Sequence, residues 1–89
     1  MKKRIHIKIY GRVQAVWFRK WAQSKANELG ISGWAKNEPN GSLSLQAEGN
    51  EAGLSRFVEE CQDGPEKAII TDLITNDIES VDEEGFNII

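Results

Sequence analysis

The chain has 89 residues, of which 39% are hydrophobic and 28% charged, and a formal net charge of −3. A chain of this length supplies one hydrophobic core, so we expect a single domain spanning residues 1–89, and the balanced composition excludes disordered and fibrous classes. The negative charge argues against a nucleic-acid or acidic-membrane partner, and the single cysteine, Cys61, excludes an internal disulfide and a multi-cysteine zinc site.

The first eleven residues begin with basic side chains but carry an alternating apolar pattern. Ile5, Ile7 and Ile9 are separated by single polar residues, which predicts a strand with one buried face that ends at Gly11. A signal peptide would instead show an unbroken apolar run, and no segment reaches the roughly 18 apolar residues that cross a bilayer. We therefore expect a cytoplasmic protein.

The next segment changes to helical spacing. Phe18, Ala22, Ala26 and Leu29 recur at the intervals of one helix face, and Gly30 is suited to end that helix in a left-handed conformation. The pattern predicts a helix that begins near Phe18.

A hairpin and a second helix follow. Segments 32–38 and 42–48 flank Pro39-Asn40-Gly41, and Asn-Gly is a strong hairpin signal because both residues tolerate positive φ. Leu54, Phe57, Val58 and Cys61 then form the stripe of an amphipathic helix, with Asn50 as its expected N-cap and Gly64-Pro65 as its end.

The C-terminal third completes the predicted fold. Segment 68–78 is rich in Ile and Thr and favours a strand whose imperfect alternation suggests a bulge, and Phe86 and Ile88 favour a short final strand after the acidic turn 82–85. The order β-α-β-β-α-β predicts an α+β sandwich of ferredoxin-like type, with a mainly antiparallel sheet and both helices on one face.

Most chemically capable side chains have a simpler structural interpretation. His6 is the only histidine and has no second histidine with which to bind a metal, and Cys61 lies in the apolar stripe, where a buried thiol is unreactive. The carboxylates are scattered over helix ends and turns, which indicates a solvated acidic surface. No triad, zinc cluster or Walker A loop is present.

The segment GRVQAVWFRK, residues 11–20, offers a different kind of site. It joins the first strand to the first helix, so it supplies unpaired amides at the positive end of a helix dipole, and Arg19 adds a permanent positive charge. A guanidinium can bind two phosphate oxygens at once. These features together favour an anion site, although an exposed arginine near a helix start is also common on structural grounds alone.

The same segment resembles the first signature of the acylphosphatase family, and GWAKNEPNGSL, residues 33–43, resembles the second. The signatures stand at the expected separation, and the pieces that follow them match over nearly the whole chain. The resemblance implies hydrolysis of the carboxyl-phosphate bond of acyl phosphates to a carboxylate and inorganic phosphate. It also implies no metal or cofactor, a small-molecule acyl phosphate as substrate, phosphate or sulfate as competing anion, and a monomer.

Site residues follow from the matched positions. Arg19 resembles the family's phosphate-binding arginine, and Asn37 resembles the asparagine that orients the attacking water. The phosphate cradle would be the backbone of residues 12–16, namely Arg12, Val13, Gln14, Ala15 and Val16. The other interpretation of Asn37 is a strand residue that caps a turn.

One residue departs from the family pattern, and three tryptophans lie in or near the two signatures. Ala15 replaces the usual glycine, so a positive φ there would strain the backbone and could move an amide away from the phosphate. The alternative hypothesis is therefore a phosphate- or sulfate-binding module of this fold with weak or no turnover. Trp17 could contact the acyl part of a substrate, but packing between loop and helix is the favoured interpretation. Trp21 is also a bulky side chain near the entrance of the expected anion site. Trp34 is interpreted as structural.

Overall fold

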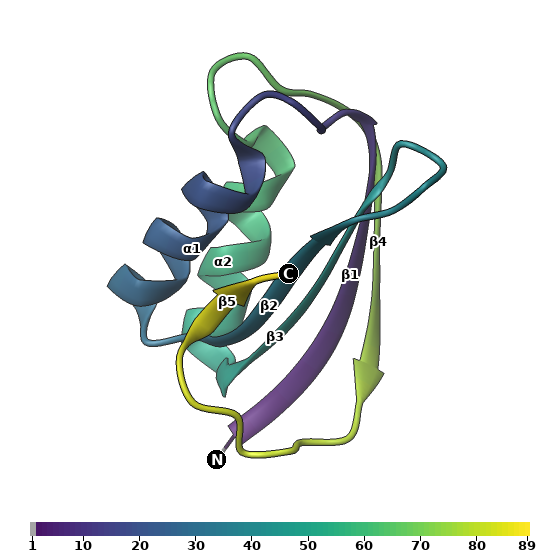
Figure 1. The fold of residues 1–89 in the computed structure, drawn as a ribbon. Helices are drawn as coiled ribbons and strands as arrows, with labels where there is room; N and C mark the ends of the chain where they lie inside the picture. Colours follow the sequence, from purple (N-terminus) through teal and green to yellow (C-terminus); the bar gives the residue numbers. More distant parts are fainter. Residues whose placement is uncertain (1) are drawn as a thin grey trace.

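The computed structural model describes residues 2–89 as two helices packed on one face of a five-stranded sheet (Figure 1). The elements are β1 (Lys2–Arg12), α1 (Phe18–Leu29), β2 (Ser32–Asn37), β3 (Leu43–Asn50), α2 (Glu51–Asp63), β4 (Ile69–Ile78) and β5 (Phe86–Ile88). The sheet order is β4-β1-β3-β2-β5, and only the β2–β5 pair is parallel. The predicted ferredoxin-like α+β fold is confirmed.

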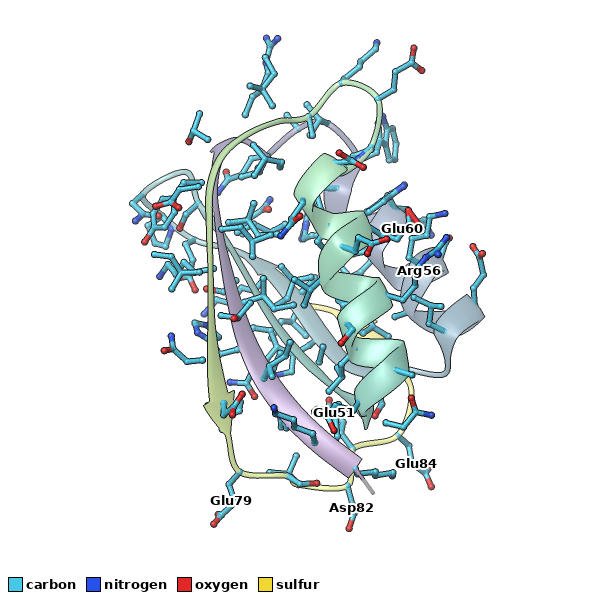
Figure 2. All side chains as sticks on the ribbon, turned by 180° about the vertical axis from the view of Figure 1, so that it is seen from behind. Glu51, Arg56, Glu60, Glu79, Asp82 and Glu84 are labelled. Carbon is cyan, nitrogen blue, oxygen red and sulfur yellow. The ribbon has the colours of Figure 1, made fainter. Side chains whose placement is uncertain are left out.

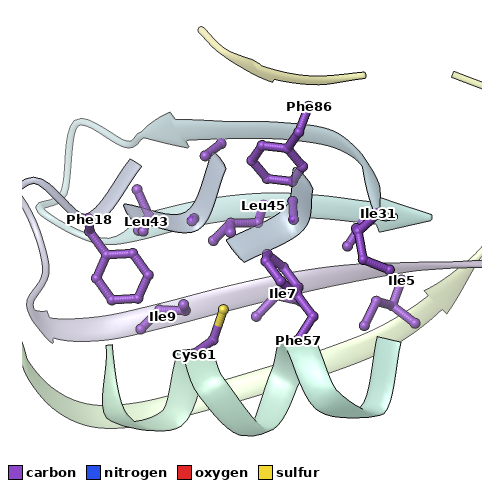
Figure 3. Packing of buried hydrophobic residues seen from close by; sticks show 14 of the residues in the cluster. Ile5, Ile7, Ile9, Phe18, Ile31, Leu43, Leu45, Phe57, Cys61 and Phe86 are labelled. Carbon is purple, nitrogen blue, oxygen red and sulfur yellow. The ribbon is translucent and has the colours of Figure 1, made fainter. Parts of the chain in front are cut away.

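The core lies between the helices and the inner face of the sheet (Figure 3). Ile7 and Ile9 of β1 are fully buried, as the alternating pattern predicts, and they face Phe57 and Cys61 of α2. Phe18 begins α1 and is also buried, so the first residue of this helix is held by the core. Burial of such large apolar side chains provides most of the favourable free energy of folding.

The end of α1 and the start of α2 are formed by the residues that the sequence predicts. Gly30 follows α1 in a left-handed conformation with φ of 68°. At the start of α2 the Asn50 side-chain oxygen accepts a hydrogen bond from the Gly53 amide at 2.7 Å, which satisfies one of the unpaired donors of the first turn. Within residues 2–89, neither helix is long and apolar enough to cross a membrane.

The suspected irregularity of the fourth strand is a bulge against β1. Tyr10 pairs with Asp72 but the next residue, Gly11, pairs with Ile70, so Thr71 is the extra residue on β4. Gly11 has φ of 121°, and a Cβ atom there would collide with the Ile69 carbonyl oxygen. The bulge therefore requires glycine at the point where β1 turns toward the following loop.

One carboxylate contradicts the expectation of a purely solvated acidic surface. Glu48 of β3 is buried, and its side chain pairs with the buried Arg4 of β1 at 3.2 Å. The segment between β4 and β5 covers both, because Glu48 also accepts hydrogen bonds from the Val81 and Asp82 amides at 2.9 and 3.0 Å. Leu43, Leu45 and Ala47 are fully buried, so the alternation along β3 places Glu48 on the outer face, but it does not reveal that a distant segment returns to cover that face.

Other acidic side chains do extend from the surface. Glu79, Asp82 and Glu84 project from the segment between β4 and β5, near the N-terminus (Figure 2). The loop between β1 and α1 lies at the opposite end of the sheet (Figure 1). These three carboxylates therefore lie away from the predicted anion site.

Candidate active site

The loop between β1 and α1 has a backbone of alternating hand. Ala15 and Trp17 adopt left-handed conformations with φ of 60° and 65°, while Val16 between them does not. Val13 and Val16 are buried and anchor the loop to the core, whereas Ala15 and Trp17 are exposed. Successive residues of opposite hand turn their amides toward a common concavity, an arrangement that favours anions.

The main-chain donors of this loop have no partner within the described chain. None of the N–H groups of residues 13–16 donates a hydrogen bond to another group of residues 2–89. Trp17 is the N-cap of α1 and supplies no side-chain cap, so the first turn of the helix adds further free amides. Polar groups left in this state need water or a ligand as acceptor.

A pocket of about 370 Å³ opens beside the loop. Its lining brings together four of the predicted site residues, Val13, Ala15, Arg19 and Asn37. Arg12, Gln14 and Val16 are not part of the lining: Arg12 is exposed at the end of β1, the Gln14 side chain turns toward the hairpin, and Val16 is in the core. The lining is completed by Trp17, Phe18, Lys20 and Ile88.

Arg19 is half-buried in the second position of α1. Its Nη1 donates a hydrogen bond to the Ile89 carbonyl oxygen at 3.3 Å, which ties the helix to the strand end beyond β5. Among residues 2–89, no aspartate or glutamate side chain pairs with it. The remaining guanidinium donors are therefore available to an anion in the pocket.

Asn37 is placed by the hairpin and by Gln14. It is the last residue of β2 and pairs with Leu43 of β3, directly before the turn. The Gln14 side-chain amide donates to the carbonyl oxygens of Glu38 at 2.8 Å and Ser42 at 2.9 Å, the two residues that close the turn. Gln14 thereby connects the β1–α1 loop to the strand end that carries Asn37.

The local charge of the pocket is opposite to that of the whole chain. Arg19 and Lys20 are in its lining and no carboxylate is. The nearest acidic residue in sequence to Asn37 is Glu38, whose pKa is lowered by a hydrogen bond from the Ser44 hydroxyl. The pocket therefore offers a site for a small anion on a protein with a formal net charge of −3.

Cys61 and His6 take no part in this pocket. Burial raises the pKa of the Cys61 thiol to about 12, so it is not a thiolate at neutral pH. His6 pairs with Gln46 in the middle of the sheet, away from the loop. In the described part of the chain no three His, Cys, Asp or Glu side chains are close enough to hold a metal ion.

Three lining residues were not selected from the sequence. Lys20 follows Arg19 directly, and its position next to the candidate arginine was the signal that could have identified it. Phe18 was interpreted only as a core residue. Ile88 gave no local signal, because its place depends on the parallel pairing of β5 with β2.

Comparisons with known proteins show which family the chain belongs to. The acylphosphatase family model matches residues 5–88. An acylphosphatase of Methylococcus capsulatus is 44% identical over 71 residues, which are 80% of this chain and 77% of that protein, and one of Rhodospirillum rubrum is 33% identical over 96% of this chain and 93% of that protein. The crystal structure of acylphosphatase from Bacillus subtilis superposes with a TM-score of 0.94 at 33% identity, covering 100% of this chain and 99% of that chain.

The family model spans nearly the whole chain, and both relatives extend over most of their own length. A solved acylphosphatase also shares the fold from end to end. The chain belongs to the acylphosphatase family and is a hydrolase of acyl phosphates.

Proposed function

We propose that the pocket hydrolyses the carboxyl-phosphate bond without a metal, with Arg19 and the amides of residues 12–16 binding the phosphoryl group and Asn37 orienting the attacking water. The observation that carries this proposal is the convergence of three features on one pocket. Within residues 2–89, these are amides without acceptors, an arginine that pairs with no aspartate or glutamate side chain, and a carboxamide at the adjacent strand end.

Phosphate binding follows from the charge and hand of the loop. Two left-handed residues separated by Val16 form a concave run of N–H donors, and the positive end of the α1 dipole adds to their field. Arg19 contributes a fixed charge whose planar donors match two phosphate oxygens. In a partly buried pocket these donors stabilise charge better than solvent does, because they are already oriented.

The reaction needs little beyond this binding. Water oxygen attacks phosphorus, the bond between phosphorus and the acyl oxygen breaks, and the electron pair leaves with a carboxylate. A carboxylate is a good leaving group at neutral pH, so no general acid is required, and phosphoryl transfer leaves positioning and charge stabilisation to the protein. Arg19 and the amides can supply the charge stabilisation that a metal ion supplies elsewhere.

Asn37 would position the water. Its side-chain oxygen can accept a hydrogen bond from the water, and the proton lost on attack can pass to a phosphate oxygen, so no strong base is needed. Gln14 holds the turn next to Asn37 through two carbonyl oxygens. We therefore assign Gln14 a positioning role between the phosphate loop and the water site.

A phosphate- or sulfate-binding module with weak turnover is the second candidate, and Ala15 favours it. Alanine in a left-handed conformation costs about 1 kcal/mol, and its methyl group lines the pocket. The loop nevertheless adopts at this position the hand that glycine would allow. The two candidate functions therefore differ in the rate of turnover, which kinetics can measure.

Hydrolysis of benzoyl phosphate by the native chain and two variants tests the proposal. Arg19→Ala should lower kcat/KM by about a thousandfold and weaken inhibition by phosphate. Asn37→Ala should lower kcat by about a hundredfold while the inhibition constant for phosphate changes by less than about threefold. Arg56→Ala, which removes an exposed arginine of α2, is the matched control and should retain native rates.

Three results would count against the proposal. Phosphate binding by the native chain without turnover would select the binding module. Similar turnover in Arg19→Ala, Asn37→Ala and the native chain would remove both residues from the mechanism. Loss of turnover only after treatment with a metal chelator would contradict a metal-independent reaction.

A further inference from the structure

Trp17 is exposed in a way that folding does not explain. It is 78% exposed, the most exposed large hydrophobic side chain among residues 2–89. The expectation that it packs between loop and helix is therefore wrong. Its neighbour Trp21 does pack, with its ring 5.3 Å from that of Phe18 in an edge-to-face contact, whereas Trp17 makes no such aromatic pair.

The backbone explains how the indole is kept outside the core. Trp17 has φ of 65°, and a bulky residue in this region is an outlier. Val16 and Phe18 on either side of it are buried, so the left-handed residue between them directs its own side chain outward. Strain at a functional loop often serves to place a side chain.

The outward direction brings Trp17 into the lining of the active-site pocket. The lining of that pocket includes two polar residues, Arg19 and Asn37, and the apolar residues Trp17, Phe18 and Ile88. The phosphoryl group of a substrate would bind to Arg19 and the loop amides. The acyl group, which is attached to phosphorus on the side opposite the attacking water, would then extend away from Asn37, and Trp17 is the exposed apolar side chain of the lining that it can reach.

We propose that Trp17 is a specificity-determining residue that binds the acyl group of the substrate and favours aromatic or bulky apolar acyl phosphates over acetyl phosphate. The inference rests on the proposed function. An indole face provides a large rigid surface for stacking, and an acetyl group is too small to cover it. The additional binding would involve only the acyl group, because Arg19 and the loop amides bind the phosphoryl group, which all acyl phosphates share.

The test compares kcat/KM for benzoyl phosphate and acetyl phosphate in the native chain and in two variants. Trp17→Asn removes the ring but tolerates the left-handed backbone, and Trp17→Phe retains an aromatic ring. The ratio of the two kcat/KM values is the readout, because any distortion of the phosphate loop affects both substrates and cancels. We expect Trp17→Asn to lower this ratio by about fivefold and Trp17→Phe to restore most of it.

A matched control removes an exposed apolar side chain elsewhere. Ile74→Thr on β4 keeps the β-branched shape at a position paired with Lys8, and it should leave the ratio and both rates unchanged. An unchanged ratio in Trp17→Asn, with both substrates still hydrolysed, would overturn the inference and leave the proposed function intact. If the native chain hydrolyses neither substrate, both the inference and the proposed function are overturned.

Discussion

Two arginines at opposite ends of the molecule show how surroundings separate a structural role from a functional one. Arg4 is 2% exposed, and its guanidinium bonds to Glu48 at 3.2 Å, to Glu83 at 2.8 Å and to Gln46 at 2.9 Å. Arg19 is half-buried, and its one hydrogen bond within residues 2–89 is to the main-chain oxygen of Ile89 at 3.3 Å. All three nitrogens of the Arg4 guanidinium donate hydrogen bonds to other side chains. Within residues 2–89, only Nη1 of Arg19 donates one.

The backbone near each arginine follows the same division. At the Arg4 end, Glu48 satisfies the amides of Val81 and Asp82 and so fixes the segment that leads to β5. At the Arg19 end, the amides of residues 13–16 have no acceptor within residues 2–89. An arginine near donors that lack an acceptor is a candidate for anion binding, whereas one paired with buried carboxylates is needed by the fold because its loss would leave a buried charge unpaired.

The largest effect is expected from Arg4→Met, which leaves Glu48 buried without its cation. The free energy of unfolding should fall by about 3–5 kcal/mol, because an uncompensated buried charge is costly. Urea denaturation measures this loss, and Lys3→Met, which removes an exposed partner of Asp77, should cost no more than about 1 kcal/mol. The kcat of the folded Arg4→Met fraction should match the native value, and a hundredfold loss would place Arg4 in the mechanism.

Acid should remove part of the same stabilisation. Burial opposes ionisation of Glu48, but hydrogen bonds from Val81, Ser80, Arg4 and Asp82 outweigh it and hold the pKa below the ordinary value of 4.5. The unfolded chain therefore binds a proton more readily, so the stabilisation is present above pH 4.5 and is lost as the pH falls through the native pKa.

A comparison with Glu48→Gln isolates this contribution from the other carboxylates. The native chain should be more stable than the variant at neutral pH, and the difference in free energy of unfolding should narrow below pH 4.5. Thermal unfolding between neutral pH and about pH 3 follows the difference. A difference that widens on acidification would mean that the pKa of Glu48 is raised.

At the pocket end of the molecule, Gln14 joins the phosphate loop to the hairpin turn. Gln14→Ala removes both hydrogen bonds to the hairpin turn, so Asn37 should shift relative to the loop and kcat should fall by about tenfold to a hundredfold. Phosphate inhibition should change less than kcat, because the loop amides and Arg19 remain. Gln46→Ala, which removes a glutamine bonded to Arg4, should instead lower stability with kcat retained.

The smallest effect is expected at Ala15. Glycine relieves about 1 kcal/mol of left-handed strain but adds about 0.5–1 kcal/mol of unfolded-state entropy, so Ala15→Gly should raise the free energy of unfolding by no more than about 0.5 kcal/mol. It should also raise kcat/KM for an acyl phosphate. Ala52→Gly in the first turn of α2 should change stability in the opposite direction. An unchanged or lower kcat/KM in Ala15→Gly would show that the loop tolerates the methyl group.

Local patterns predicted most of the fold because each depends on a few neighbouring residues. The stripe ending at Cys61, the cap at Asn50 and the turn at Asn40-Gly41 are local signals, and the structure contains all of them. The covered face at Glu48 was not predictable in this way, since it depends on a segment more than thirty positions away.

The pocket was predictable only in part for the same reason. Two sequence signatures identified Arg19 and Asn37, and both are in its lining. The exposure of Trp17 depends on its backbone hand, and the position of Ile88 depends on which strand β5 joins. Neither is determined by the composition of the neighbouring residues.

Amide NMR during titration with inorganic phosphate measures whether the loop amides and Arg19 bind one phosphoryl group together. The N–H signals of residues 13–16 should shift and saturate in the native chain and in Asn37→Ala, and should respond far more weakly in Arg19→Ala. Signals of these residues that do not move in the native chain, or that move equally in Arg19→Ala, would show that the amides and Arg19 do not share a phosphate.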